Sequence, residues 1–177
     1  MEFTEELLPG TWLIKFKSFE DARGTFIKTF ARTLFEYNNA YLDVQEEYYS
    51  VSNKNVIRGM HFQNPPHDHS KLVYCPIGAV DDVLLDLRSG SGYGKVANVR
   101  LSQDKPFLVF MPKGIAHGFR SLEDGSMMVY KTSSEYEQAA DSGVRWDSFG
   151  YDWGLDQPTM SDRDRMHVSF KNFLTPF

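Results

Sequence analysis

The stretch KLVYCPIGAVDDVLLDLR, residues 71–88, carries the clearest indication of the fold. Its apolar residues form two short runs, and the segment from Pro76 to Gly78 separates them. Short apolar runs that are bounded by proline and glycine are typical of β-strands. The stretch therefore predicts two strands with a turn between them.

Segments of the same character extend from this stretch in both directions, over residues 11–19, 24–31, 94–102, 106–112 and 126–136. The turn signals DARG, SGSGYG, PKG and EDG lie between them. Many short strands at spacings of roughly 8–12 residues are typical of a β-sandwich or barrel. Helix is predicted only at residues 32–39 and in parts of the tail after Ser161. We therefore expect an all-β fold with a few short helices.

Length and composition fit one globular domain that spans residues 1–177, with 41% hydrophobic and 15% aromatic residues. The net charge of −5 argues against a general nucleic-acid binder, although it permits a local basic pocket for a phosphorylated ligand. The single cysteine, Cys75, cannot form an internal disulfide. No apolar run approaches the roughly 20 residues of a membrane helix, and the acidic N-terminus does not resemble a secretory signal. We expect a cytoplasmic protein without membrane or nucleic-acid partners.

Four polar residues interrupt or flank apolar segments and are candidates for chemistry, namely His61, Lys71, His117 and Tyr130. Taken singly, each is more typical of packing or of a strand end than of catalysis. In a small barrel, however, alternate residues of each strand point inward, so distant polar residues can meet in one cavity. Such convergence would favour a functional site.

A metal site is the alternative. His67 and His69 are spaced i and i+2, which places them on one face of a strand. Together with His117 they could form a three-histidine site for zinc or iron. Because the pair follows Pro65 and Pro66 directly, a solvated loop is favoured over a strand.

Several motifs together resemble the dTDP-4-dehydrorhamnose 3,5-epimerase family, and the resemblance covers nearly the whole chain. They are DARGTF (21–26), NVIRGMHFQ (55–63), KLVYCPIGAVDDVLLDLR (71–88), MPKGIAHGF (111–119), VYKTSSEY (129–136), GVRWD (143–147), YDW (151–153) and MSDRD (160–164). The resemblance implies a cupin-type jelly roll, usually a homodimer. It also implies an isomerase that acts on nucleotide-linked 4-keto-6-deoxy sugars in deoxysugar biosynthesis, without a metal or nicotinamide cofactor.

The resemblance also assigns roles residue by residue. His61 is implied to be the catalytic base, Asp164 the carboxylate that orients it, and Tyr130 the acid on the opposite face of the sugar. Further residues are implied to bind the substrate: Arg58, Lys71 and His117 around the sugar, Arg23 at the pyrophosphate, and Tyr136 near the nucleotide. His67 and His69 are then expected at the rim.

Two departures fall where the family contacts its nucleotide sugar. Glu46-Glu47-Tyr48 stands in place of the usual Q-x-N, and Lys28 stands in place of an acidic residue. These changes leave CDP or GDP open as the nucleotide, and the sequence does not decide whether C3, C5 or both are inverted. Lys28 and Glu46 are expected either to form a swapped charge pair, across a dimer interface for example, or to be solvated separately.

Two other functions remain open from the sequence. One is a metal-dependent cupin enzyme that uses His67, His69 and His117. The other is a non-catalytic protein that binds sugar nucleotides. This second function would not explain why His61, Tyr130 and Asp164 occur together.

Overall fold

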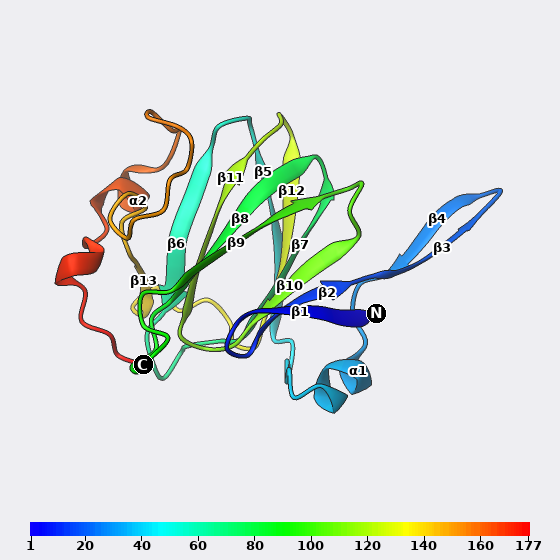
Figure 1. Cartoon of the computed structure of the whole chain (residues 1–177), viewed down its shortest axis with the longest axis horizontal. Helices are drawn as coiled ribbons and strands as arrows, with labels where there is room; N and C mark the ends of the chain where they lie inside the picture. Colours follow the sequence, from blue (N-terminus) through cyan, green and yellow to red (C-terminus); the bar gives the residue numbers. More distant parts are fainter.

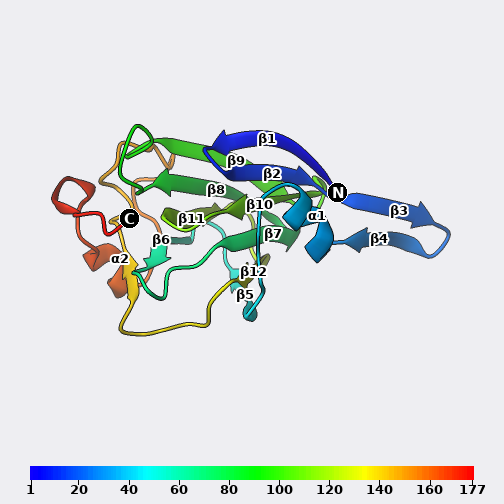
Figure 2. The ribbon, with the colours of Figure 1, turned by 90° about the horizontal axis from the view of Figure 1, so that it is seen from below.

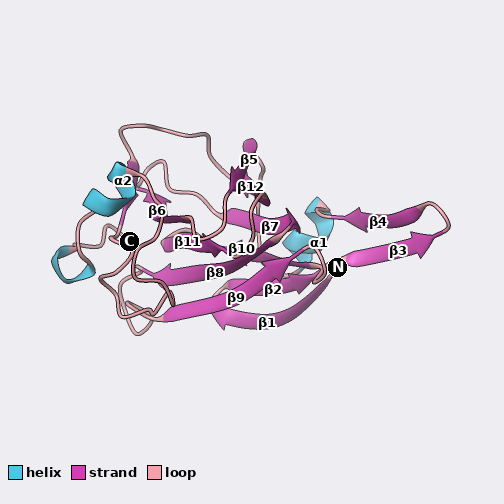
Figure 3. Cartoon of the chain, turned by 90° about the horizontal axis from the view of Figure 1, so that it is seen from above, coloured by secondary structure: helices cyan, strands magenta, loops and turns pink.

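The computed structural model describes residues 1–177 and consists mainly of β-strands. The strands are β1 (Glu2–Leu8), β2 (Thr11–Lys15), β3 (Lys17–Asp21), β4 (Gly24–Lys28), β5 (Glu46–Ser52), β6 (Ile57–Gln63), β7 (Lys71–Ile77), β8 (Ala79–Asp86), β9 (Val96–Ser102), β10 (Phe107–Met111), β11 (Ile115–Ser121), β12 (Ser126–Thr132) and β13 (Asp141–Gly143). The helices are α1 (Arg32–Tyr37), α2 (Asp162–Met166) and the 3₁₀ turn η1 (Phe170–Asn172). All of these helices lie at the periphery (Figure 3). None of them has the length and apolar character that crossing a membrane requires.

Two antiparallel sheets face each other, as Figures 1 and 2 show. One sheet has six strands in the order β1-β2-β10-β7-β12-β5, and the other has five in the order β13-β6-β11-β8-β9. Strands β3 and β4 pair only with each other and project from the body (Figure 1). The prediction of an all-β sandwich with a few short peripheral helices is confirmed.

The core lies between the sheets and draws apolar side chains from both. Its fully buried members include Val73, Val80, Leu84, Leu101 and Val109. A second apolar cluster packs the chain after residue 143 against the five-stranded sheet, and a third packs α1 against the six-stranded sheet. The second cluster matters for function because it holds the tail that contains α2 beside β6 (Figure 1).

The stretch 71–88 forms two strands, as predicted, but they belong to different sheets. β7 lies in the six-stranded sheet and β8 in the five-stranded one, so the chain crosses between the sheets at the intervening turn. Gly78 sits in this turn with φ +75°, and a side chain there would collide with Ser126. The turn therefore requires glycine both for its backbone conformation and for the close approach of β12.

Strand register brings polar residues from five strands together. His117 on β11 lies opposite His61 on β6, and Tyr130 on β12 lies opposite Tyr48 on β5. Lys71 on β7 lies opposite Thr132 on β12. These residues are far apart in sequence and share one end of the sandwich only because of this pairing.

Candidate active site

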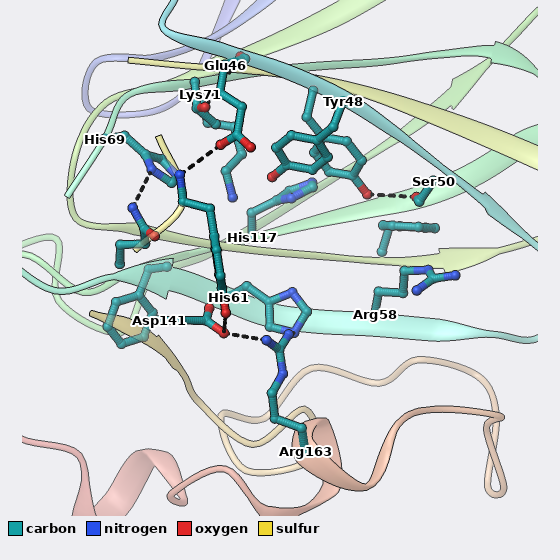
Figure 4. A pocket seen from close by; sticks show the side chains of 16 residues that line it. Glu46, Tyr48, Ser50, Arg58, His61, His69, Lys71, His117, Asp141 and Arg163 are labelled. Carbon is teal, nitrogen blue, oxygen red and sulfur yellow. Dashed lines mark hydrogen bonds and ion pairs between the residues drawn. The ribbon is translucent and has the colours of Figure 1, made fainter. Parts of the chain in front are cut away.

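A cavity of about 370 Å³ lies between the sheets and contains most of the predicted site (Figure 4). Eight of the predicted residues line it: Glu46, Tyr48, Arg58, His61, Lys71, His117, Tyr130 and Tyr136. Asp164 lies directly behind His61 and contacts it. The convergence that the sequence could not establish is therefore present.

His61 and Asp164 form a hydrogen-bonded pair. Nε2 of His61 lies 2.8 Å from Oδ1 of Asp164, and the backbone N–H of Gly59 donates to Oδ2 at 3.2 Å. Ser161 caps α2 by accepting from the Asp164 N–H, so the helix start fixes the carboxylate. Because a carboxylate only accepts, Nε2 carries the hydrogen and Nδ1, which has no partner in the protein, keeps its lone pair. The free lone pair makes His61 suited to act as a base.

The pKa values of this pair favour a neutral imidazole and an ionised carboxylate. Burial alone would raise the pKa of Asp164, but the nearby His167, whose Nε2 is 3.7 Å from Oδ1, and the hydrogen bonds from His61 and the Gly59 N–H hold that pKa far below its usual range. Burial lowers the pKa of His61, and the attraction of Asp164 is opposed by the positive charges of Arg163 and Lys71. The base therefore starts uncharged near neutral pH, as proton abstraction requires.

Arg163 adds positive charge to the dyad. Its Nη2 lies 2.8 Å from Nε2 of His61, its Nε lies 3.3 Å from Oδ1 of Asp164, and it forms an ion pair with Asp141. Nε2 of His61 donates its hydrogen to the Asp164 carboxylate, so it cannot also accept a hydrogen bond from Arg163. Arg163 consequently acts on His61 by its charge.

Tyr130 stands across the cavity and is only 7% exposed. Its hydroxyl lies 3.2 Å from Oγ of Ser50, and its ring stacks on Tyr48 with 4.7 Å between the centroids. Burial raises the pKa of the Tyr130 phenol well above its usual value, so it stays protonated and can donate. Burial likewise raises the pKa of Tyr48, to about 12.

Three cationic or polar groups surround the space between His61 and Tyr130. Lys71 is 6% exposed and forms no hydrogen bond with the protein, and burial lowers its pKa to about 8. Arg58 donates through Nε to Oγ of Ser52 at 3.0 Å. His117 is buried and bonded to Asp82 at 2.6 Å. The buried positive charge of Lys71, which has no hydrogen-bonded partner in the protein, suits a ligand on which negative charge develops.

The predicted residues Arg23 and Lys28 lie on the β3–β4 hairpin, outside the cavity of the same chain. The Arg23 side chain is 90% exposed and pairs with the neighbouring Asp21. Glu46 does not pair with Lys28 within the chain; instead, its Oε2 accepts from the Tyr136 N–H at 2.9 Å. The charge pair is therefore absent within one chain.

The three-histidine site of the metal alternative is not assembled. His69 contacts Gln63 and Ser134, whereas His117 is bonded to Asp82. The only group with three potential ligand atoms close together, within 4.8 Å, is His61, Asp164 and His167. The guanidinium of Arg163 brings positive charge into that space, so the donor set does not suit a cation.

Four residues of the site were missed from sequence. Ser50, Asp141 and Arg163 line the cavity, and Asp82 orients His117 from beneath it. Two of them had a signal: Arg163 precedes Asp164 in MSDRD, and Asp82 is an acidic residue within a buried apolar strand. Nothing local distinguishes Ser50 or Asp141.

Comparison with known proteins gives a consistent result. The family model "dTDP-4-dehydrorhamnose 3,5-epimerase" matches residues 5–172. The Shigella flexneri protein of that name is 35% identical over 161 residues, 89% of each chain. The crystal structure of the Bacillus anthracis enzyme with TDP and PPi bound matches with a TM-score of 0.92 at 30% identity and covers 95% of this chain and 98% of that one. A 3′-monoepimerase from Streptomyces bikiniensis in complex with dTDP-quinovose matches with a TM-score of 0.89 at 26% identity, covering 97% and 88%.

Nearly the whole chain is covered by each of these matches, and the sandwich agrees with the cupin-like β fold of the solved relatives. The chain thus belongs to the dTDP-4-dehydrorhamnose 3,5-epimerase family, whose members are isomerases that act on sugar nucleotides.

Proposed function

We propose that the protein inverts C3, C5 or both in a nucleotide-linked 4-keto-6-deoxy sugar, with His61 as base and Tyr130 as acid. The single observation that carries this is that His61 and Tyr130 line the same cavity, with the buried and unpaired Lys71 beside them. Family membership supports the substrate class.

The reaction needs a proton removed and returned on opposite faces of a carbon next to the ketone. Nδ1 of His61 takes the proton, and the C–H electron pair moves toward the carbonyl to form an enolate. Lys71 and Arg58 stabilise the oxygen that gains charge; losing one such donor typically costs about 2.7–4 kcal/mol of transition-state stabilisation. The enolate carbon then takes the hydroxyl proton of Tyr130, which leaves a phenolate. Proton exchange with solvent restores both groups.

Asp164 supports this cycle without entering it. By accepting from Nε2 of His61 at 2.8 Å, it fixes the tautomer and stabilises the imidazolium formed after abstraction. Positioned acid and base groups of this kind contribute roughly 10²- to 10⁴-fold to a rate.

The identity of the nucleotide depends on the β5 side of the cavity. Relatives are named for dTDP sugars, and we take dTDP as the first candidate, with CDP and GDP as alternatives. Glu46 and Tyr48 line the cavity where the family resemblance has an amide pair, and they are the residues that would alter the choice.

We also propose a homodimer in the cytoplasm. The β3–β4 hairpin exposes Phe19, Phe26 and Ile27 and makes no sheet contact with its own chain. A second copy that covers these side chains would also bring Arg23 and Lys28 toward a cavity. The buried thiol of Cys75, with no disulfide, suits a reducing compartment.

The test is solvent exchange in deuterated water, followed by NMR, with a panel of 4-keto-6-deoxy sugars on dTDP, CDP and GDP. We expect deuterium at C3, C5 or both in one member of the panel, and none with His61→Ala. Exchange that is unchanged in His61→Ala would refute the assignment of the base. Absence of exchange with every sugar for the unaltered protein would refute the function.

A further inference from the structure

The acid Tyr130 is held by a second phenol, Tyr48. The two residues are direct cross-strand partners on β12 and β5, and their rings stack at 4.7 Å with an interplanar angle of 15°. Tyr48 lines the cavity together with Lys71 and His117 (Figure 4). No protein group is bonded to the Tyr48 hydroxyl, so its fixed partner is the ring of Tyr130.

Contacts on three sides confine Tyr130. Tyr48 covers one ring face, the Ser50 hydroxyl meets the phenol oxygen at 3.2 Å, and His117 contacts the ring edge-on at 6.0 Å and 73°. Tyr48 is 40% exposed whereas Tyr130 is 7% exposed. Tyr48 therefore forms the outer layer of the stack and shields the inner phenol from water.

We propose that Tyr48 is a positioning residue that holds the Tyr130 phenol against the face of the enolate opposite His61 and thereby sets how often the intermediate is inverted. This inference rests on the proposed function. It concerns the fate of the enolate after His61 has removed the proton.

That intermediate has two outcomes. In the first, the imidazolium of His61 returns a proton to the same face, which restores the original configuration. In the second, Tyr130 gives its hydroxyl proton to the opposite face, which inverts the carbon and leaves a phenolate. In deuterated water Tyr130 carries deuterium, so inversion labels the carbon, whereas the imidazolium of His61 labels it with retention once the abstracted proton has exchanged with solvent. Because His61 is the same in every variant, a change in the ratio of retained to inverted labelled product reports how well the phenol is placed relative to the base.

The experiment measures this ratio by NMR for the unaltered protein and four variants. Tyr48→Phe keeps the stacked ring, Tyr48→Asn removes it, and Tyr48→Leu replaces it with an apolar side chain that is not flat. The matched control is Tyr49→Asn, which changes the next residue of β5 on its outward, exposed face.

We expect Tyr48→Phe and Tyr49→Asn to keep the ratio of the unaltered protein within about twofold. Tyr48→Asn and Tyr48→Leu should raise it by roughly 2- to 13-fold, the equivalent of the typical 0.5–1.5 kcal/mol for an aromatic pair at tenfold per 1.36 kcal/mol. Should Tyr48→Asn not fold, Tyr48→Leu carries the comparison.

The ratio separates positioning from general damage, because a partly unfolded enzyme loses both outcomes in proportion. An unchanged ratio in the folded Tyr48→Asn or Tyr48→Leu protein overturns the inference, as does a ratio that rises equally in Tyr48→Phe. If the unaltered protein exchanges no sugar of the panel, the proposed function itself has failed, and the two failures are thus distinguishable.

Discussion

Lys71 shows how one residue can define the chemistry of a cavity. Its ammonium is buried and has no hydrogen-bonded partner in the protein, and burial lowers its pKa to about 8. An unpaired buried charge is unfavourable in the free protein, so it is suited to a state in which an anion forms beside it. The enolate of the proposed reaction is such an anion.

The pH dependence of kcat/KM should follow Lys71 and His61. We expect activity to fall on the acid side below pH 6.5, because the pKa of His61 is lowered and only the neutral imidazole is a base. On the alkaline side it should fall near pH 8, as Lys71 loses its charge. Lys71→Arg, which keeps its charge, should lack the limb near pH 8 while retaining reduced activity. If the loss of activity near pH 8 persists in Lys71→Arg, it is caused by the titration of a group other than Lys71.

Arg163 should control the acid limb. Its guanidinium disfavours the imidazolium of His61, so Arg163→Gln removes a positive charge and should raise the pKa of His61. The acid limb of kcat/KM is then expected at higher pH than in the unaltered protein. Arg165→Gln is the control, because Arg165 bonds to the Pro158 carbonyl and does not line the cavity. Equal profiles for Arg163→Gln and the unaltered protein would contradict this role.

Glu46 should oppose the binding of an anionic nucleotide sugar. Glu46→Gln keeps an acceptor for the Tyr136 N–H and removes one negative charge from the cavity wall. We expect KM to fall by roughly fivefold with little change in kcat, on the basis of about 1 kcal/mol between unit charges 4 Å apart in water. Glu47→Gln is the control, because Glu47 faces outward and pairs with Lys131. A higher KM for Glu46→Gln would show that the carboxylate binds the ligand instead.

At the scale of elements, local pattern identified strands but not their partners. The apolar runs of 71–88 became β7 and β8, and residues 32–39 contain α1. Five strands were not predicted, namely β1, β5, β6, β11 and β13. Of these, β1 and β5 are edge strands whose sequences, EFTEELL and EEYYSVS, carry charged or polar residues on exposed faces. The pairing of β7 with β10 and β12 joins distant segments, and nothing in a local pattern encodes it.

The close approach of the paired strands β6 and β11 depends on two glycines, Gly59 and Gly118. A Cβ on Gly118 would lie 2.7 Å from Met60 Sδ, 2.9 Å from the Arg58 carbonyl oxygen and 3.2 Å from the Cα of Gly59. Gly118→Ala should therefore destabilise the protein by about 1–3 kcal/mol, the usual range for overpacking a core. Chemical denaturation measures this as a lower unfolding midpoint. An unchanged midpoint would show that the strands separate at little cost.

At the scale of the whole molecule, the predicted residues divide into two sets. Eight line the cavity of one chain, and their roles were assigned by the family resemblance, since spacing alone could not show that five strands and α2 meet. Arg23 and Lys28 lie outside, on the projecting hairpin, where sequence gives no indication of distance from the cavity. Their predicted roles depend on a second copy.

The hairpin should be essential for assembly. Phe26 is 62% exposed and packs against Phe19 alone among aromatic rings. We expect Phe26→Asp to convert a dimer to a monomer in size-exclusion chromatography with light scattering, because it places a charge in an apolar contact. Tyr37→Asp, on the exposed side of α1, is the control and should remain dimeric. If the Phe26→Asp protein has the same mass in solution as the unaltered protein, the hairpin is not part of the interface.

The separation of His61 from Asp164 by 103 positions has a consequence for synthesis of the chain. Both sheets are complete in sequence by Gly143, whereas the carboxylate arrives only with α2. A product released early by the ribosome would carry the imidazole, the phenol and the lysine but no orienting partner. Completion of the pair of base and carboxylate therefore requires translation to reach α2, near the C-terminal end of the chain.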